Sequence, residues 1–284
     1  MSGPARAPAP DTAALAARFP RGFAWGVSTS AYQIEGAVAE DGRGPSIWDV
    51  FSHQPGRVRH GDHGDVACDH YHRAEADLDL MAALGVRAYR FSVAWPRVLP
   101  DGVGAVNAPG LDFYERLVEG LLARGIRPVL NLYHWDLPQA LQARGGWGHP
   151  DAAAWFADYA SVVAGRLGDR VAHWITINEP QVFAFTGHAD GRHAPGLRDW
   201  PTALRVADAA LRAHAAAAER IRAHASGARV GVALDLNLVQ PATASDEDAA
   251  AAARQMAVRQ RWFLDPLFGR GYPVEAVALH EAAG

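Results

Sequence analysis

Short apolar runs alternate with longer amphipathic segments along most of this 284-residue chain. Runs with the length and β-branched content of strands are each followed by a segment of helical periodicity, five times in series. The strand candidates are Phe23–Ser28, Arg87–Ser92, Arg127–Tyr133, His173–Ile177 and Arg229–Leu234, and the helix candidates are Asp69–Ala83, Leu111–Arg124, Asp151–Leu167, Pro201–His224 and Glu247–Phe263. Such a series predicts a parallel sheet with helical crossovers.

Two architectures carry this repeat, a doubly wound open sheet and a (β/α)8 barrel. A doubly wound nucleotide-binding sheet has a glycine-rich phosphate loop after an early strand, and the segment Gly26–Gln33 lacks that spacing. The barrel is therefore favoured. About five of its eight units are present, so the predicted fold class is α/β, an incomplete (β/α)8 TIM-barrel type. Gly85, Gly125 and Gly168 follow three of the helices and predict left-handed C-caps.

The N-terminal end differs in composition from the rest. Residues 1–18 are rich in alanine and proline and predict a flexible tail, in which Pro4, Pro8 and Pro10 interrupt helix formation. Residues 19–284 contain no linker and predict one partial (β/α)8 domain.

Charge and cysteine content exclude several classes of protein. The formal net charge of −4 gives no reason to expect nucleic acid or an anionic membrane as a partner. No window approaches the roughly 18 apolar residues of a membrane span, and the first twenty residues hold no apolar stretch of signal-peptide length. The single Cys68 excludes an intramolecular disulfide and fits a reducing compartment. We therefore expect a cytoplasmic protein.

Polar side chains follow every predicted strand. In chain order they are Gln33 and Glu35, Arg90 and Trp95, His134, Trp135 and Asp136, Asn178 and Glu179, and Asp235 and Asn237. The carboxyl ends of barrel strands meet at one face, where the chemistry takes place. Amides, an imidazole and indoles beside a carboxylate suit a sugar pocket, because hydroxyls need donors and acceptors and a pyranose packs on aromatic rings. For any single aromatic residue, the alternative is that it caps the core.

Seven motifs in series carry a family resemblance. They are Phe23–Gly36, Ser46–Asp49, Asp65–Tyr71, Tyr89–Ser92, Leu132–Pro138, Thr176–Pro180 and His193–Gly196. Together they resemble the signatures of glycoside hydrolase family 1, the retaining β-glucosidases, from about residue 19 to the C-terminus. The resemblance implies that residues 19–284 are part of a catalytic domain that hydrolyses terminal β-D-glucosidic bonds with two carboxyl groups. It also implies a β-glucoside or related small oligosaccharide as substrate, and no cofactor.

The resemblance gives individual residues their roles. Glu179 matches the general acid/base, which protonates the leaving oxygen and later activates water. Arg90 matches the arginine that contacts the nucleophilic carboxylate. The residues that match those holding the sugar at the cleavage subsite are Gln33, His134, Trp135 and Asn178. Glu35 is expected to be structural, and Asp235 stands where the family more often has asparagine, so its role stays open.

The second catalytic carboxyl group is missing from this pattern. The family's nucleophile lies in a Thr-Glu-Asn-Gly type motif after a later strand, and no such motif occurs here. Nothing in the pattern places Asp235 near Glu179. Without a neighbouring like charge, the pKa of Glu179 is expected to be lower than in a complete site, and Arg90 to lack its main anionic partner.

Two interpretations of this gap stay open beside a competent hydrolase. The chain is an inactive, truncated remnant that at most binds sugar, or it is one half of a split enzyme with a complementary C-terminal fragment. An open five-stranded sheet leaves two edges and an apolar face uncovered. The isolated chain is therefore expected to be marginally stable, aggregation-prone or oligomeric.

Two rival functions are weaker. Potential metal ligands crowd one segment, namely His60, Asp62, His63, Asp65, Cys68, His70 and His72. We interpret this segment as a solvated loop leading into a helix, with no metal, because the family motif accounts for several of these residues without one. A 6-phospho-β-glycosidase of the same family is the other rival, and the chain shows no dedicated basic phosphate cluster.

Overall fold

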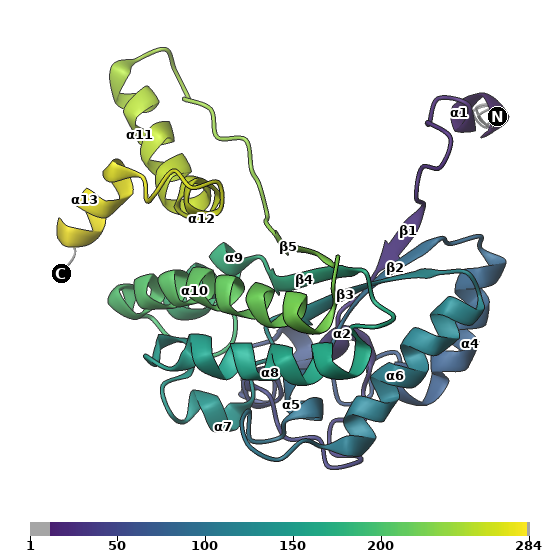
Figure 1. The fold of residues 1–284 in the computed structure, drawn as a ribbon. Helices are drawn as coiled ribbons and strands as arrows, with labels where there is room; N and C mark the ends of the chain where they lie inside the picture. The colour runs from purple at the N-terminus through teal and green to yellow at the C-terminus, as the bar shows by residue number, and fades with distance from the viewer. Residues whose placement is uncertain (1–11, 283–284) are drawn as a thin grey trace, which may run out of the picture.

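The computed structural model describes residues 12–282, in which five strands form one parallel sheet (Figure 1). The strands are β1 (Gly26–Ser28), β2 (Ala88–Ser92), β3 (Arg127–Tyr133), β4 (His173–Asn178) and β5 (Arg229–Ala233). They neighbour one another in chain order, and every pairing is parallel. A doubly wound sheet reverses its order at a switch point, whereas this sheet does not. The prediction of a barrel-type sheet with five of eight units is confirmed.

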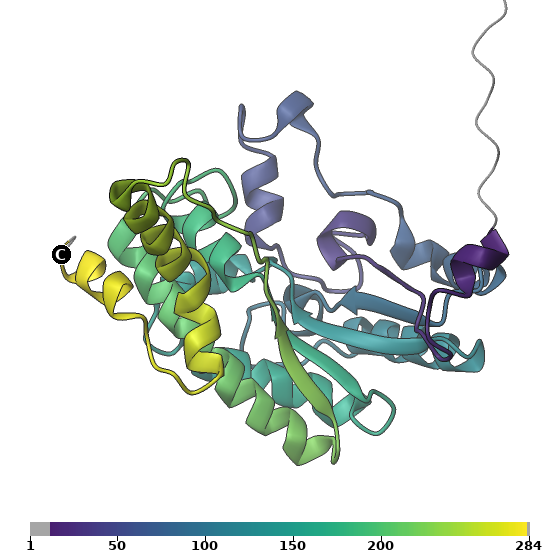
Figure 2. The same ribbon diagram turned by 90° about the horizontal axis from the view of Figure 1, so that it is seen from above.

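Four long helices connect successive strands. They are α4 (His70–Ala83), α6 (Ala108–Ala123), α8 (Ala152–Leu167) and α10 (Trp200–His224). All four lie on the same face of the sheet, as expected when every crossover has the same hand (Figure 1). The opposite face, turned toward the viewer in Figure 2, is not covered by these helices.

Shorter elements fill the connections. In chain order they are α1 (Thr12–Ala16), α2 (Ala31–Ile34), α3 (Ile47–Ser52), η1 (Arg59–Gly61), α5 (Trp95–Val98), α7 (Gln139–Gln142), η2 (Gly146–Gly148) and α9 (Pro180–His188). Of the predicted flexible tail, residues 1–11 lie outside the described residues. Helix α1 forms in the remainder with no buried residue, because the three prolines of the tail all precede Thr12. The flexibility of the tail stays a prediction.

Two local predictions need correction. The first strand begins at Gly26 rather than Phe23, and the rings of Phe23 and Trp25, just before it, pack on each other at 4.8 Å between centroids. Gly85 and Gly125 do adopt positive φ, but Gly168 has a right-handed φ of −65°. At Gly168 a Cβ atom would lie 2.5 Å from the main-chain oxygen of Ala164 and 3.1 Å from that of His224. Close approach to the last turn of α8 and to the end of α10 therefore explains this glycine, not a left-handed turn.

The core fills the space between the sheet and its helices. Tyr89 and Phe91 of β2 are buried there, and Trp95 stacks on Tyr159 of α8 at 4.8 Å between ring centroids. The core also encloses an ion pair, since Nε of Arg97 lies 3.0 Å from Oε2 of Glu35. The hydroxyl of Tyr114 donates to the other oxygen of Glu35 at 2.7 Å. Glu35 thus occupies the structural position that the family resemblance implies.

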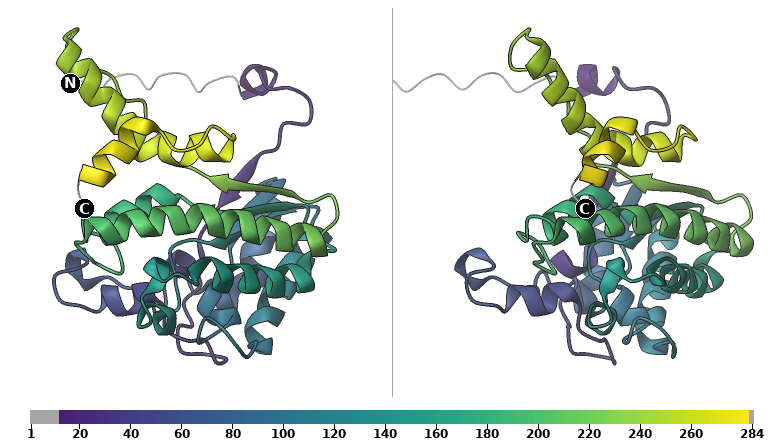
Figure 3. Two further views of the ribbon diagram at one scale, coloured as in Figure 1. Left: turned by 60° about the vertical axis from the view of Figure 1, so that its left-hand side comes forward. Right: turned by 90° about the vertical axis from the view of Figure 1, so that its left-hand side faces the viewer.

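The C-terminal segment joins this core through a few buried residues, chiefly Trp262 and Phe263. After β5 an extended stretch leads to α11 (Asp246–Met256), and none of the residues of α11 is buried. The predicted helix Glu247–Phe263 is divided, because a π-helical turn, η3 (Ala257–Arg261), separates α11 from α12 (Trp262–Leu267). With α13 (Val274–Ala282), these helices lie beyond the uncovered face (Figures 1 and 3). Phe263 reaches back to Phe185 of α9, with ring centroids 6.4 Å apart.

Candidate active site

The carboxyl ends of β1 to β4 carry the residues predicted to form the site. Gln33 lies on α2, which follows β1, and Arg90 lies within β2. The site residues of the later strands are His134 and Trp135, directly after β3, Asn178, the last residue of β4, and Glu179, the next residue. Because the strands are parallel, these side chains meet at one edge of the sheet.

Asn178 is the centre of a hydrogen-bond network at this edge. Its Oδ1 accepts a hydrogen bond from Nη2 of Arg90, and its Nδ2 lies 3.3 Å from Nε2 of His134. Its main-chain oxygen accepts a hydrogen bond from Nε1 of Trp135 at 2.9 Å. Asn178 is only 1% exposed, and buried polar groups of this kind hold their partners in fixed orientations. The structure therefore brings together four of the predicted site residues.

Two site residues have strained backbone. Trp135 and Glu179 have φ values of 78° and 49°, in the left-handed region that side chains rarely adopt. Each such residue costs about 1–3 kcal/mol and persists where the surroundings enforce it, often at functional sites. The Glu179 amide donates to the main-chain oxygen of Ala233 at 2.7 Å, which ties the end of β4 to β5.

The electrostatics of Glu179 suit an acid. Burial is the main factor that raises the pKa of its carboxyl group, and the charge of Asp235 raises it further. Arg90 and a hydrogen bond from Asn178 act in the opposite direction. Nothing in the sequence pattern placed Asp235 near Glu179, but its charge acts on the Glu179 carboxyl group. Asp235 thus supplies a like charge that was expected to be absent.

Arg90 and His134 are affected by the same burial. Burial lowers the pKa of Arg90, whereas the Glu179 carboxylate raises it, so Arg90 does have one anionic neighbour. Burial, with the Arg90 charge, lowers the pKa of His134 to about 4. The imidazole is therefore neutral at neutral pH, with one nitrogen that donates and one that accepts. A neutral ring of this kind is suited to binding a hydroxyl group.

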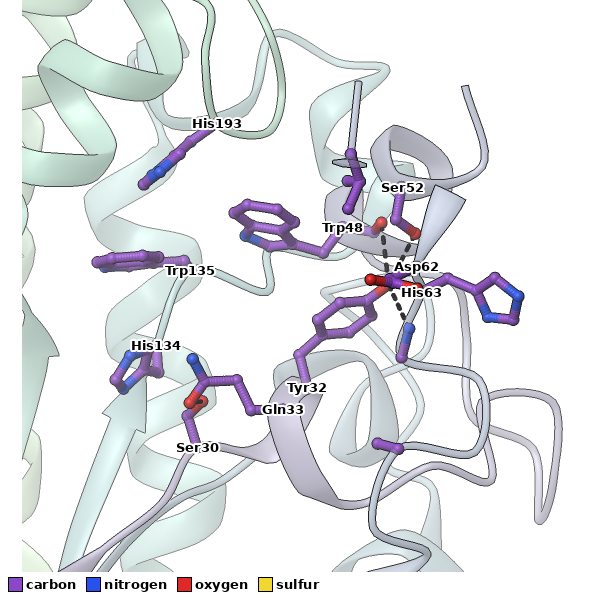
Figure 4. A pocket seen from close by; sticks show the side chains of 13 residues that line it. Ser30, Tyr32, Gln33, Trp48, Ser52, Asp62, His63, His134, Trp135 and His193 are labelled. Atoms are coloured by element: carbon purple, nitrogen blue, oxygen red, sulfur yellow. Dashed lines mark hydrogen bonds between the residues drawn. The ribbon is translucent and has the colours of Figure 1, made fainter. Parts of the chain in front are cut away.

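A pocket of about 460 Å3 opens beside this network (Figure 4). Gln33, His134 and Trp135 line it, and the side chains of Gln33 and Trp135 point into the same space in Figure 4. Oε1 of Gln33 accepts a hydrogen bond from the Ser30 hydroxyl at 2.7 Å, which directs the amide group. Three of the four predicted sugar contacts therefore line one pocket. The fourth, Asn178, contacts two of these lining residues, Trp135 and His134.

Three aromatic residues of this pocket were not predicted as site residues. Trp48 and His193 face each other at 5.6 Å between ring centroids, and His193 also lies 5.4 Å from the Trp135 ring. Tyr32 completes the wall and is held by Ser52, whose hydroxyl lies 2.9 Å from the tyrosine oxygen. All three belong to motifs that carried the family resemblance, and that membership was the available signal.

A second pocket of about 360 Å3 adjoins the first, and His193 lines both. Asp235 and Asn237, which follow β5, lie in this second pocket, together with Gln181 of α9. The Gln181 side chain donates a hydrogen bond to the main-chain oxygen of Asp235. This hydrogen bond joins the start of α9, next to Glu179, to the segment that carries Asp235.

The crowded histidine segment does not form one cluster. Nδ1 of His70 lies 2.6 Å from Asp77, and His72 bonds to Asp69 and Glu40. Cys68 is exposed. Most of the suspected ligands thus have partners of their own or face solvent.

A parallel barrel-type sheet with a carboxyl group and a polar, aromatic pocket at its strand ends is the arrangement of a (β/α)8-barrel enzyme site. Among such enzymes the chain belongs to glycosyl hydrolase family 1, whose family model matches residues 15–284. Among the described residues, no helix is long and apolar enough to cross a membrane.

Named relatives agree with this assignment. The chain is 48% identical over 266 residues to Beta-glucosidase A of Acetivibrio thermocellus, covering 94% of this chain and 59% of the relative. It is 49% identical over 258 residues to Beta-glucosidase A of Thermotoga maritima, covering 90% of this chain and 58% of the relative. The solved family 1 β-glucosidase of Thermotoga maritima superposes with a TM-score of 0.90 at 47% identity, covering 93% of this chain and 60% of that one. The chain thus spans less than two thirds of the length of these relatives.

Proposed function

We propose that this chain provides the acid/base half of a retaining β-glucosidase, which hydrolyses terminal β-D-glucosidic bonds. One observation carries the proposal: Glu179, with a raised pKa, directly follows the buried Asn178, which bonds to Arg90 and Trp135 and contacts His134. A general acid works best when its pKa approaches the working pH. The site therefore supports protonation of a leaving group beside a preformed polar pocket.

The proposed chemistry needs only proton transfer and a nucleophile. The carboxyl group of Glu179 donates its proton to the glycosidic oxygen while the bond from that oxygen to the anomeric carbon breaks. In the second step the Glu179 carboxylate takes a proton from the water molecule that attacks the glycosyl–enzyme bond. Gln33, His134 and Asn178 orient the sugar hydroxyls, and Trp135 packs against the ring. No cofactor takes part in this scheme.

A glucoside is the substrate that the relatives favour. Two neighbours are structures of Thermotoga maritima β-glucosidase in complex with glucoimidazole and with deoxynojirimycin, at 47% and 48% sequence identity to this chain. We infer that the pocket beside Trp135 takes a terminal glucosyl unit in the same way. The polar and aromatic lining, with the neutral His134, is consistent with an uncharged sugar.

The proposed scheme needs a nucleophilic carboxyl group besides Glu179. No Thr-Glu-Asn-Gly motif occurs in the 284 residues. Asp235 is an exposed carboxylate that influences Glu179, but its Oδ2 already accepts a hydrogen bond from Asn237 at 3.1 Å. We propose that a segment outside these residues, on the same polypeptide or on a partner, supplies the nucleophile. Without it the chain binds sugar and does not turn it over.

An assay on a chromogenic aryl β-glucoside tests this proposal. The chain alone should show no turnover beyond a Glu179→Gln control, and addition of a fragment with the missing motif should restore turnover only when Glu179 is intact. Turnover by the chain alone that Asp235→Asn abolishes would make Asp235 the nucleophile and contradict the proposal. Restored turnover that survives Glu179→Gln would remove Glu179 from the acid/base role.

Two further proposals concern the cellular location of the chain and its association with other chains. We propose a cytoplasmic location, which rests on the single cysteine, and association of the chain with a second copy or a complementary fragment. Association is supported by the edge strand β1, whose Val27 side chain is 42% exposed. Sedimentation of the purified chain would test it, and a monomer at all concentrations would contradict it.

A further inference from the structure

Two imidazole rings stack beside one carboxylate at the rim of the sugar pocket. His53 directly follows α3, whereas His63 and Asp65 follow η1. The two rings are 4.7 Å apart between centroids, with an interplanar angle of 25°. Nε2 of His53 lies 3.2 Å from Oδ2 of Asp65, and Nδ1 of His63 lies 3.2 Å from Oδ1. The carboxylate therefore turns one oxygen toward each ring.

A contact outside the group fixes the tautomer of His53. Its Nδ1 lies 2.7 Å from the main-chain oxygen of Asp49, and a carbonyl oxygen only accepts hydrogen bonds, so Nδ1 carries a hydrogen. In the neutral ring, Nε2 then turns a lone pair toward the carboxylate, and the two lone pairs repel. A proton or a metal ion on Nε2 removes this repulsion. Metal-binding histidines commonly donate their second nitrogen to a backbone carbonyl in this manner.

Asp65 retains unused binding capacity. Its Oδ1 is buried and accepts no hydrogen bond from any of residues 12–282. The contact of this oxygen with His63 lies within ion-pair distance but lacks the geometry of a hydrogen bond. Buried acceptor atoms normally have a hydrogen-bond partner, so Oδ1 of Asp65 is expected to bind one. That partner is more readily a cation than another protein group.

We propose that His53, His63 and Asp65 bind one divalent transition-metal ion, best matched by Zn2+, at the rim of the sugar pocket. The three potential ligand atoms all lie within 4.8 Å of one another. Bond lengths of about 2.0–2.2 Å in a tetrahedral zinc site place ligand atoms about 3.4 Å apart. Each histidine nitrogen lies 3.2 Å from a different oxygen of Asp65, so an ion between the two rings is within reach of the carboxylate. Two nitrogen donors and one oxygen favour zinc or its neighbours over Ca2+ or Mg2+, which prefer oxygen.

The site can accept an ion without rearrangement of the core. The side chains are 33% to 48% exposed, so water can complete the coordination. The ligands come from two ends of the loop between α3 and α4, and a shared ion would close that loop. His63 and Gly64 line the sugar pocket, and the Gly64 amide donates to the Tyr32 hydroxyl at 3.2 Å. A bound ion would therefore stabilise one wall of the pocket. This inference does not rest on the proposed hydrolase activity.

Equilibrium dialysis of the metal-free chain against ZnCl2, with bound zinc measured by mass spectrometry, tests the proposal. We expect one equivalent to bind saturably, and His63→Ala and Asp65→Asn each to weaken binding by at least about tenfold. His60→Ala is the matched control, because His60 lies in the same loop outside the three-residue group and should leave binding unchanged.

Two results would overturn the assignment. One is a folded chain, by circular dichroism, that binds no zinc saturably. The other is zinc binding that is equal in His63→Ala and in the unmodified chain. Because the His63 side chain is 43% exposed, this substitution keeps the test valid even if Asp65→Asn does not fold.

Discussion

Strands β2 to β4 and the segment that begins with β5 are built differently. Most residues of β3 and β4 are buried. Asn178 at the end of β4 is fixed by this packing and by its hydrogen bond from Arg90 of β2. In β5 no residue is fully buried, and Asp235 beyond it is exposed. The acid/base side of the site is therefore fixed by its surroundings, whereas the side that carries Asp235 is not. Preorganisation here follows from the layer of helices that covers the strands.

The largest expected effect comes from the buried ion pair of the packed region. Arg97→Ala leaves the Glu35 carboxylate buried without its cation, which costs about 3–5 kcal/mol. Glu275→Ala removes an exposed pair with Arg261 in the C-terminal segment and should cost about 0–1 kcal/mol. Urea unfolding of both variants measures the two costs. Equal losses would mean that the two regions are equally important to stability.

Paired leucine substitutions sharpen the same contrast without charge. Leu132 of β3 is fully buried, so Leu132→Ala should lower the free energy of unfolding by about 2–5 kcal/mol. Leu238, after β5, is 84% exposed, and Leu238→Ala should change it by less than about 0.5 kcal/mol. Thermal unfolding checks both values. A larger loss at Leu238 would mean that this side chain is buried in the folded chain rather than exposed.

A buried acid gives the packed region its own pH dependence. Burial raises the pKa of Asp136 to about 8, and neither of its carboxylate oxygens has a hydrogen-bond partner among residues 12–282. An unfolded aspartic acid has a pKa of about 3.9. Between these values the folded chain binds more protons than the unfolded chain, so stability falls as pH rises from about 4 to about 8.

Asp136→Asn should remove this pH dependence. The contribution of Asp136 is at most about 1.4 kcal/mol per pH unit, for instance between pH 6 and pH 7. Melting temperatures of both chains across that range give the measurement. If the wild-type chain instead becomes more stable with rising pH by the same amount as the variant, the carboxyl group is not buried in its neutral form.

The smallest effect links the two regions through Glu179. Asp235→Asn should lower the pKa of Glu179, because it removes a like charge, and Arg90→Met should raise it, because it removes a cation. At high salt, Asp235→Asn should shift the pKa of Glu179 less than Arg90→Met does, because the charge of the exposed Asp235 is screened. NMR titration of labelled glutamate resolves both shifts. If Asp235→Asn leaves the pKa of Glu179 unchanged, the segment after β5 does not influence the site.

Sequence patterns predicted the elements better than the contacts between them. Strand and helix periodicities gave the five βα units and their order, because apolar spacing is a local property. The effect of Asp235 on Glu179 depends on the path of the extended stretch after β5 and could not be read from spacing. The division of the last helix by η3 has no signal in the apolar spacing either. The left-handed φ of Glu179 is imposed by tertiary structure, since glutamate does not favour it.

Sugar binding by the chain alone tests most directly whether the acid/base half is preformed. Tryptophan fluorescence would be followed while an aryl β-glucoside is added to the unmodified chain, to Asn178→Ala and to the control Leu238→Ala. The account predicts saturable binding that Leu238→Ala keeps and that Asn178→Ala weakens by about tenfold or more, because Arg90, His134 and Trp135 lose their common partner. A folded chain without saturable binding, or equal binding in Asn178→Ala, would contradict it.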